Sequence, residues 1–184
     1  MLQYLPNCLT ILRLLLAVPL GLLILQESYT AALAIGFLAG LTDALDGFAA
    51  RRLKAFSRFG AALDPVADKV LVTVSFLSFA YIGLIPWYVA ITVIGRDLVI
   101  VTGALCYHWV IGSFDFAATT LSKANMAIQI CFCVMLLAAQ LIQDISPELI
   151  LTATSLVLVI AIASGLDYVI TWAIKAMRER AKKQ

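Results

Sequence analysis

Four aspartates stand close together in a chain that is otherwise strongly apolar. They are Asp43, Asp46, Asp64 and Asp68, within the stretch DALDGFAARRLKAFSRFGAALDPVAD. Members of the first pair are three residues apart and members of the second pair four, so each pair falls on one face of a helix. Carboxylate oxygens are the ligands that hard divalent cations such as Mg²⁺ and Mn²⁺ prefer. The spacing therefore predicts that two neighbouring helices gather four carboxylates around one or two divalent ions.

The charge of these aspartates needs a partner. Four ionised carboxylates at close range repel one another, and Arg51 and Lys69 are the basic residues close enough in sequence to help. Divalent cations are the better partner, and small residues beside the aspartates leave room for a ligand: Gly47, Ala49, Ala50, Gly60, Ala61 and Ala62. The alternative is that the aspartates are salt-bridged structural residues or helix caps. Convergence of four of them argues against that alternative.

The composition indicates how these residues are held. Hydrophobic residues make up 63% of the 184 positions and charged residues 13%, whereas an average soluble domain has roughly 45–50% and about 25%. A helix needs about 20 mostly apolar residues to cross a bilayer, and only helices and closed barrels can do so. We therefore expect a single-domain, all-α integral membrane protein over residues 1–184, with six transmembrane helices in the apolar runs 9–26, 30–49, 62–84, 86–107, 121–143 and 147–175.

The basic residues predict the orientation. With six crossings both termini lie on one side, and most Lys and Arg residues fall on that side: Arg51, Arg52, Lys54 and Arg58 after the second run, and Lys175, Arg178, Arg180, Lys182 and Lys183 after the last. Basic connections face the cytoplasm. We expect both termini and the polar, metal-containing pocket to be cytoplasmic, in a bacterial inner membrane. Membrane lipids are the expected partners of these basic residues, and no nucleic acid is expected as a partner.

The aspartate stretch resembles the signature of a known family. Asp43, Asp46, Gly47, Ala50, Arg51, Gly60, Asp64 and Asp68 match the pattern D-x-x-D-G-x-x-A-R-x8-G-x3-D-x3-D of the CDP-alcohol phosphatidyltransferases at all eight positions. LPNCLTILR looks like the family's opening, with Asn7, Thr10 and Arg13 at matching places. The resemblance implies an integral membrane enzyme, generally a homodimer, that displaces CMP from a CDP-linked lipid with an alcohol.

The resemblance also implies roles for the matching residues. Asp43, Asp46, Asp64 and Asp68 would hold two divalent metal ions, Mg²⁺ or Mn²⁺, that grip the pyrophosphate of CDP-diacylglycerol. Asp68 would also be the catalytic base toward the acceptor hydroxyl. Contacts to the CDP group would come from Asn7, Thr10, Asp46, Gly47, Arg51 and Gly60.

The second half of the chain bears on the acceptor alcohol. Arg96 and Asp97 lie midway through the fourth run, where they either pair structurally or leave Arg96 to reach an acceptor phosphate together with Lys123. Asn125 follows on the fifth run, and Asp167 on the sixth is as well suited to structural pairing as to acceptor contact. We take Arg96, Lys123, Asn125 and Asp167 as the acceptor-binding candidates.

These segments look most like cardiolipin synthases of the CDP-alcohol type, which use phosphatidylglycerol as acceptor. Relatives that use glycerol 3-phosphate tend to have RE in place of RD, and a further Arg where this chain has Ala104. Met126 departs from the expected pattern, since Thr usually follows the Asn. Phosphatidylglycerophosphate synthase, acting on glycerol 3-phosphate, is therefore the alternative enzyme.

A small cation transporter is the alternative outside enzymology, because intramembrane carboxylates also mark ion pathways. Such a pathway needs acidic groups toward the far side of the membrane. The acids expected there, Glu27, Asp144 and Glu148, fall in connections between the apolar runs. This distribution favours a pocket that opens to one side.

Overall fold

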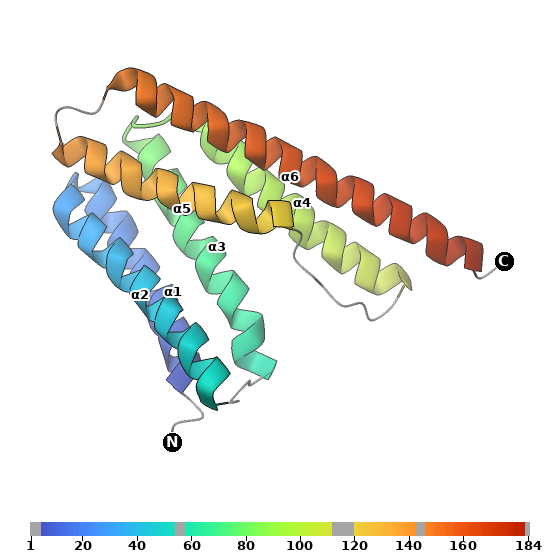
Figure 1. Ribbon diagram of the computed structural model, residues 1–184. Coiled ribbons are helices and arrows are strands. Elements are labelled where there is room, and N and C mark those ends of the chain that lie inside the picture. The colour runs from blue at the N-terminus through green and yellow to red at the C-terminus, as the bar shows by residue number, and fades with distance from the viewer. Residues whose placement is uncertain (1–4, 54–57, 112–119, 143–145, 183–184) are drawn as a thin grey trace. The chain divides into compact units, whose positions relative to one another are not determined.

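The computed structural model describes the backbone of residues 5–53, 58–111, 120–142 and 146–182, and the side chains of residues 10–42, 66–103, 120–142 and 146–172. The described part of the chain forms helices and no strand, which confirms the all-α class. In chain order the helices are α1 (Leu5–Leu25), α2 (Tyr29–Leu53), α3 (Arg58–Tyr81), α4 (Trp87–Ile111), α5 (Thr120–Leu141) and α6 (Pro147–Lys182), as Figure 1 shows.

Two of the helices end with residues in the left-handed backbone region. Gly83 follows α3 with φ of 79°, and the amide of Leu84 donates to the carbonyl of Phe79. Glu27 follows α1 with φ of 57°, and the amide of Ser28 donates in the same way to Leu23. This arrangement pairs carbonyls that a helix end would otherwise leave without donors. It reverses the chain within a few residues, so that α2 returns beside α1.

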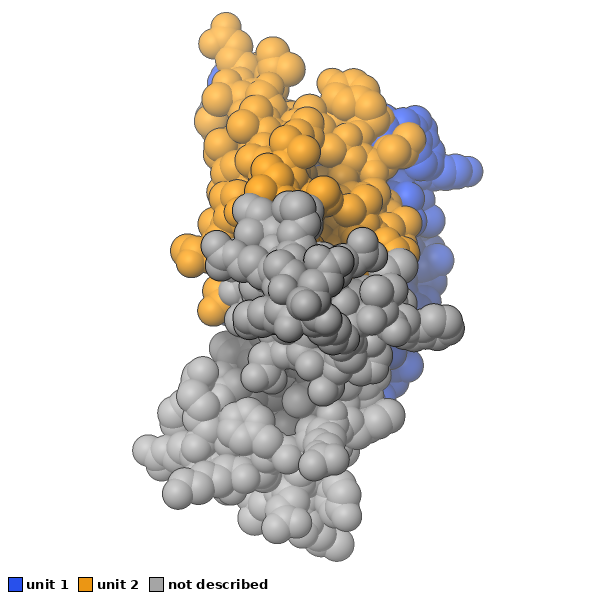
Figure 2. Space-filling view, turned by 90° about the vertical axis from the view of Figure 1, so that its right-hand side faces the viewer, with its two compact units in different colours: residues 1–87, 133–146 blue, residues 88–132, 147–184 orange. Residues whose placement is uncertain are grey.

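The chain divides into two compact units, which Figure 2 distinguishes by colour. Unit 1 comprises residues 1–87 and 133–146, and so contains α1, α2, α3 and the last part of α5. Unit 2 comprises residues 88–132 and 147–184, and so contains nearly all of α4, the first part of α5 and α6. The expectation of a single domain stays a prediction.

In unit 1, α1 packs against both α2 and α3. Its buried residues from position 10 onward recur mostly every three or four positions, which places them on one face of the helix; they are Thr10, Arg13, Ala17, Leu20, Gly21 and Ile24. Gly21 allows α3 to come close, because a Cβ atom there would lie 2.6 Å from Val74 Cγ1. Two of these six residues, Thr10 and Arg13, are polar, and both precede Ala17.

In unit 2, α4 and α6 lie side by side and run in the same direction. Arg96 on α4 lies against Gly165 on α6, and two turns later Gly103 lies against the ring of Trp172. A Cβ atom on Gly103 would be 3.1 Å from that ring, so the glycine is what lets the indole lie close to α4. The first part of α5 runs the opposite way (Figure 1).

The outer faces of the helices are apolar and exposed. In the part of the chain that the structure describes, α5 and residues 147–172 of α6 are long and apolar enough to cross a membrane. Only 28% and 22% of their apolar stretches is buried, and large side chains such as Phe37 and Leu151 are about two-thirds exposed or more, at 72% and 67%. Water-soluble monomers rarely expose apolar surface on this scale. Six crossings and the cytoplasmic position of the termini stay predictions.

Candidate functional site

The four aspartates lie on the two helix ends that the short 54–57 connection joins. Asp43 and Asp46 fall near the end of α2, and Asp64 and Asp68 fall in the first turns of α3. The side chains of Asp43, Asp46 and Asp64 lie outside the described residues, as do those of Asn7 and Arg51, and at Gly47 and Gly60 only the helical backbone is described. Within the described side chains no group of three or more His, Cys, Asp or Glu residues gathers. The predicted carboxylate cluster therefore stays a prediction, with Asp68 as its described member.

Asp68 forms an ion pair with Arg13 of α1. Nη1 of Arg13 donates to Oδ1 of Asp68 at 2.5 Å. The Arg13 side chain is 2% exposed and that of Asp68 is 18% exposed. An arginine keeps its charge in any protein environment, and a buried charge is tolerated when it is paired and hydrogen-bonded. The pair thus fixes the position of the Asp68 carboxylate at one end of the packed face between α1 and α3.

Sequence reasoning did not identify this partner. Arg51 and Lys69 are the basic residues near the aspartates in the chain, and divalent cations are the preferred partners, whereas the guanidinium that pairs with Asp68 comes from Arg13, 55 residues away. One signal was available in the sequence. Arg13 falls on the same helical face as Ala17, Leu20 and Ile24, and an arginine on a buried apolar face requires a charged partner.

Thr10, the one CDP-contact candidate whose side chain is described, lies one turn before Arg13. It is 4% exposed and shares the buried face of α1 with the arginine. Its hydroxyl is therefore near the Arg13–Asp68 pair, although its contact with a nucleotide stays a prediction.

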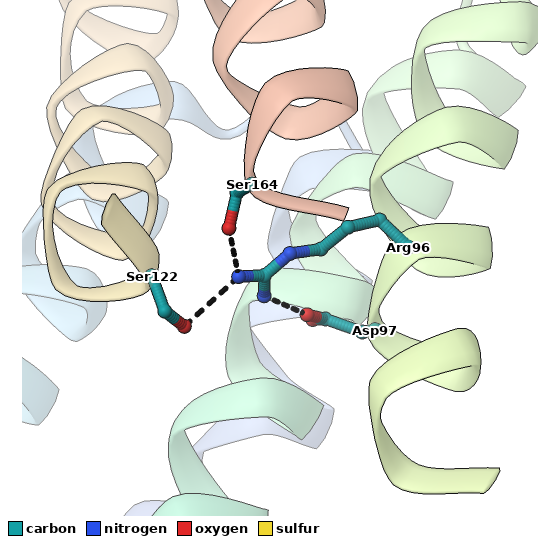
Figure 3. A network of polar contacts seen from close by, with 4 residues as sticks. All are labelled: Arg96, Asp97, Ser122 and Ser164. Atoms are coloured by element: carbon teal, nitrogen blue, oxygen red, sulfur yellow. Dashed lines mark hydrogen bonds and ion pairs between the residues drawn. The ribbon is translucent and has the colours of Figure 1, made fainter. Parts of the chain in front are cut away.

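Arg96 is the centre of a second polar cluster, which lies in unit 2. Its Nη1 donates to Oδ1 of Asp97 at 2.6 Å, and its Nη2 donates to the hydroxyls of Ser122 at 2.9 Å and Ser164 at 2.5 Å. Figure 3 shows the guanidinium at the point where the three partners converge. Since Ser122 belongs to α5 and Ser164 to α6, one side chain joins three helices. Sequence reasoning did not single out either serine.

This geometry favours the structural reading of the Arg96–Asp97 pair. Arg96 is 8% exposed, and both terminal nitrogens of its guanidinium already have partners. The remaining acceptor candidates are distributed differently: Lys123 is exposed, Asn125 is buried and Asp167 is half-buried. No hydrogen bond or ion pair joins Arg96, Lys123, Asn125 and Asp167 to one another in the described part of the chain. Acceptor binding by these residues stays a prediction.

Comparisons with known proteins agree with the sequence signature. The family model described as CDP-alcohol phosphatidyltransferase matches residues 3–174. Over 150 residues the chain is 37% identical to a protein of Rattus norvegicus and 36% identical to one of Homo sapiens, each called cardiolipin synthase (CMP-forming). These matches cover 73% of this chain and 50% of each relative, so the chain spans about half the length of those relatives.

A bacterial relative is named for the alternative enzyme, which acts on glycerol 3-phosphate. Over 103 residues the chain is 36% identical to the CDP-diacylglycerol--glycerol-3-phosphate 3-phosphatidyltransferase of Aquifex aeolicus (strain VF5), a match covering 54% of this chain and 57% of the relative. The family model covers residues 3–174, which is nearly the whole sequence. The chain belongs to the CDP-alcohol phosphatidyltransferase family.

Proposed function

We propose that the protein is a membrane enzyme that transfers a phosphatidyl group from CDP-diacylglycerol to phosphatidylglycerol, forming cardiolipin and releasing CMP. The observation that carries the reaction type is the buried Arg13–Asp68 pair, which fixes the last carboxylate of the family signature at the end of the α1–α3 packing face. Family membership supplies the reaction class.

The choice of acceptor rests on two observations. Two relatives called cardiolipin synthase (CMP-forming) match 73% of this chain, whereas a relative named for glycerol 3-phosphate matches 54%. In addition, Asp97 and Ala104 stand where relatives that use glycerol 3-phosphate tend to have Glu and Arg. A site with less positive charge suits a phosphodiester better than a doubly charged phosphomonoester. Phosphatidylglycerophosphate synthase activity is the second candidate.

In the proposed reaction the acceptor's hydroxyl oxygen attacks the phosphorus of the phosphatidyl group. The bond from that phosphorus to the bridging oxygen of the pyrophosphate breaks, and CMP leaves with the electron pair. Asp68 accepts the hydroxyl proton. Arg13 does not touch the substrate in this scheme; it holds the Asp68 carboxylate so that the acceptor meets it in a fixed orientation.

The four signature carboxylates fit two divalent ions by their chemistry. They are oxygen donors, which Mg²⁺ and Mn²⁺ prefer, and the short connection between α2 and α3 brings their two helix ends to the same end of unit 1. We assign the ions to Asp43, Asp46, Asp64 and Asp68, where they would neutralise charge on the pyrophosphate. Thr10, Asn7, Gly47, Arg51 and Gly60 are the proposed contacts to CDP.

The acceptor side is proposed to use Lys123, Asn125 and Asp167. Arg96 is assigned to positioning, because its guanidinium already binds Asp97, Ser122 and Ser164. The exposed apolar faces of the helices support placement in a bilayer, and the basic residues support an inner membrane with the site facing the cytoplasm. Six crossings and a homodimer complete the proposal.

The test is to supply purified protein with CDP-diacylglycerol and Mg²⁺ or Mn²⁺ and to measure CMP release with each acceptor in turn. We expect release with phosphatidylglycerol and little with glycerol 3-phosphate, inositol phosphate or serine. Asp68→Asn should lower turnover by about a thousandfold or more, the size seen when an essential base is removed. Release with glycerol 3-phosphate alone would overturn the acceptor, and ion flux in liposomes without CMP release would overturn the enzyme.

A further inference from the structure

Two amide side chains lie buried on one face of α5. Asn125 is 1% exposed and Gln129 is 3% exposed. They are four residues apart, so their side chains are neighbours along the helix. Ser122, one turn before Asn125, accepts a hydrogen bond from Arg96. The two amides therefore continue the polar face of α5 beyond the Arg96 cluster, within unit 2.

Some of the polar atoms of the two amides have no hydrogen-bond partner among the described residues. Oδ1 and Nδ2 of Asn125 and Nε2 of Gln129 have no hydrogen-bond partner in the part of the chain that the structure describes. Two other buried hydroxyls of unit 2 are paired, since Ser164 accepts from Arg96 and Thr154 donates to the carbonyl of Ile150 at 2.7 Å, while Nε of Arg96 also lacks a partner among the described residues. Since burial of an amide without a partner is costly, these three atoms indicate that a ligand completes the site.

The unpaired atoms restrict the chemistry of that ligand. Nδ2 of Asn125 can only donate and its Oδ1 can only accept. A phosphate oxygen can accept from Nδ2 but cannot donate to Oδ1. An ammonium or guanidinium group can donate to Oδ1 but cannot accept from Nδ2. A hydroxyl group satisfies both, because it donates one hydrogen bond and accepts others. The site therefore fits an alcohol.

We propose that Asn125 and Gln129 bind a non-reacting hydroxyl of the acceptor's glycerol group, an inference that rests on the proposed function. A neutral amide does not take a proton, so it suits a hydroxyl that stays intact rather than one that reacts. Phosphatidylglycerol and glycerol 3-phosphate both carry such a secondary hydroxyl. The amide pair thus selects polyol acceptors over alcohols with a single hydroxyl, and leaves the choice between those two acceptors to other residues.

The test compares acceptors that differ by this one hydroxyl. Phosphatidylglycerol is matched with phosphatidyl-1,3-propanediol, and glycerol 3-phosphate with 3-hydroxypropyl phosphate; each analogue keeps the reacting primary hydroxyl. We expect kcat/KM of the natural protein to fall about tenfold for the analogue, the effect of leaving a buried polar group unpaired. Asn125→Leu and Gln129→Met, which keep side-chain size, should abolish that preference. Thr154→Val, which removes a buried hydroxyl already paired within its own helix, is the control and should retain it.

Thermal unfolding without acceptor supplies a second readout. Removing an unpaired buried amide should raise the unfolding midpoint of Asn125→Leu, while its KM for phosphatidylglycerol rises about tenfold. A lower midpoint with the hydroxyl preference retained would show that the amide is structural and would overturn the proposal. A higher midpoint with the preference retained would indicate an ordered water in place of the acceptor, and would overturn it too.

Failure of the proposed function gives a different result. In that case the natural protein releases no CMP with any acceptor, and the hydroxyl site is tested by binding alone. Phosphatidylglycerol should then raise the unfolding midpoint of the natural protein more than phosphatidyl-1,3-propanediol does, and this difference should vanish in Gln129→Met. Equal shifts for the two lipids would overturn the amide site independently of catalysis.

Discussion

Among the described side chains, each unit buries one arginine, and the two arginines are held in different ways. Arg13 in unit 1 reaches across from α1 to the carboxylate of Asp68 on α3, which keeps 18% of its side chain exposed. Arg96 in unit 2 pairs with the carboxylate next to it in sequence and adds hydroxyls from two other helices. The first arginine holds the carboxylate that we propose as the general base. The second has partners that all belong to the packing of its own unit.

This difference teaches how a buried charge can be assigned a role. A buried cation always needs compensation, so burial alone does not separate a functional arginine from a structural one. The partner separates them: a partly exposed signature carboxylate indicates a site, whereas a neighbouring carboxylate and two serines from other helices indicate a structural clamp. The predictions below test that distinction, beginning with the largest expected effect.

Neutralising the pair of unit 1 should affect both stability and turnover. Arg13→Gln leaves the Asp68 carboxylate without its guanidinium, and loss of one partner of a buried pair typically costs about 3–5 kcal/mol. We also expect turnover to fall at least about a hundredfold, because the general base loses its fixed position. Both are measured on detergent-purified protein, by thermal unfolding and by CMP release at a temperature where the variant is folded.

The double variant Arg13→Gln with Asp68→Asn separates the two effects. Two amides can hydrogen-bond to each other without a buried charge, so stability should recover relative to either single variant. Turnover should not recover, because the base is gone. Recovery of turnover in the double variant would show that Asp68 is not the base and that the pair only holds α1 to α3.

Changing the arginine of unit 2 should act mainly on stability. Arg96→Lys keeps the charge, but a single ammonium group cannot reproduce the planar fork that binds Asp97, Ser122 and Ser164 together. We expect a loss of about 2 kcal/mol, the value of one or two hydrogen bonds to a charged group, with the KM for the acceptor changed less than about threefold. A rise of tenfold or more in that KM at unchanged stability would instead place Arg96 on the acceptor's phosphate.

The helices and the pairing of Arg96 with Asp97 were predictable from sequence, whereas the contacts of the two arginines with other helices were not. Each described helix covers most of one of the six apolar runs, because a stretch that must be buried or face lipid has to satisfy its backbone internally. Two helices continue beyond their apolar runs: α6 extends to Lys182 and α2 to Leu53, whereas the runs end at 175 and 49. The added residues are mostly Lys, Arg, Ala and Glu, which are good helix formers. Apolar runs mark the part of a helix suited to lipid, and the helix itself extends further.

The candidate site was predictable only where its residues share a helix. The pairs Asp43 with Asp46 and Asp64 with Asp68 follow from helical spacing, since the distance between neighbours on one helix is fixed. The contact from Arg13 to Asp68 spans 55 positions, and it depends on how α1 and α3 pack. No rule of spacing gives that distance. Ser164 was missed for the same reason, because its hydrogen bond with Arg96 depends on how α6 packs beside α4.

The smallest expected effects come from one glycine beside each cluster. A Cβ atom on Gly21 would lie 2.6 Å from Val74 Cγ1, and Val is stiff at χ1, so α1 and α3 must move apart. A Cβ atom on Gly165 would lie 3.4 Å from Cγ of Arg96, an ordinary contact. Since Ala is favoured over Gly in a helix by about 1 kcal/mol and overpacking costs about 1–3 kcal/mol, Gly21→Ala should destabilise slightly and Gly165→Ala should stabilise slightly.

These two variants are each other's control, because the same methyl group is added to a helix in both. Thermal unfolding in one detergent would measure the difference between their midpoints. We expect Gly21→Ala also to lower turnover a few-fold, since moving α3 away from α1 lengthens the contact between Arg13 and Asp68, while Gly165→Ala leaves turnover unchanged. If both variants shifted turnover equally, the catalytic carboxylate would not depend on the α1–α3 contact, and the distinction between the two arginines would lose its structural basis.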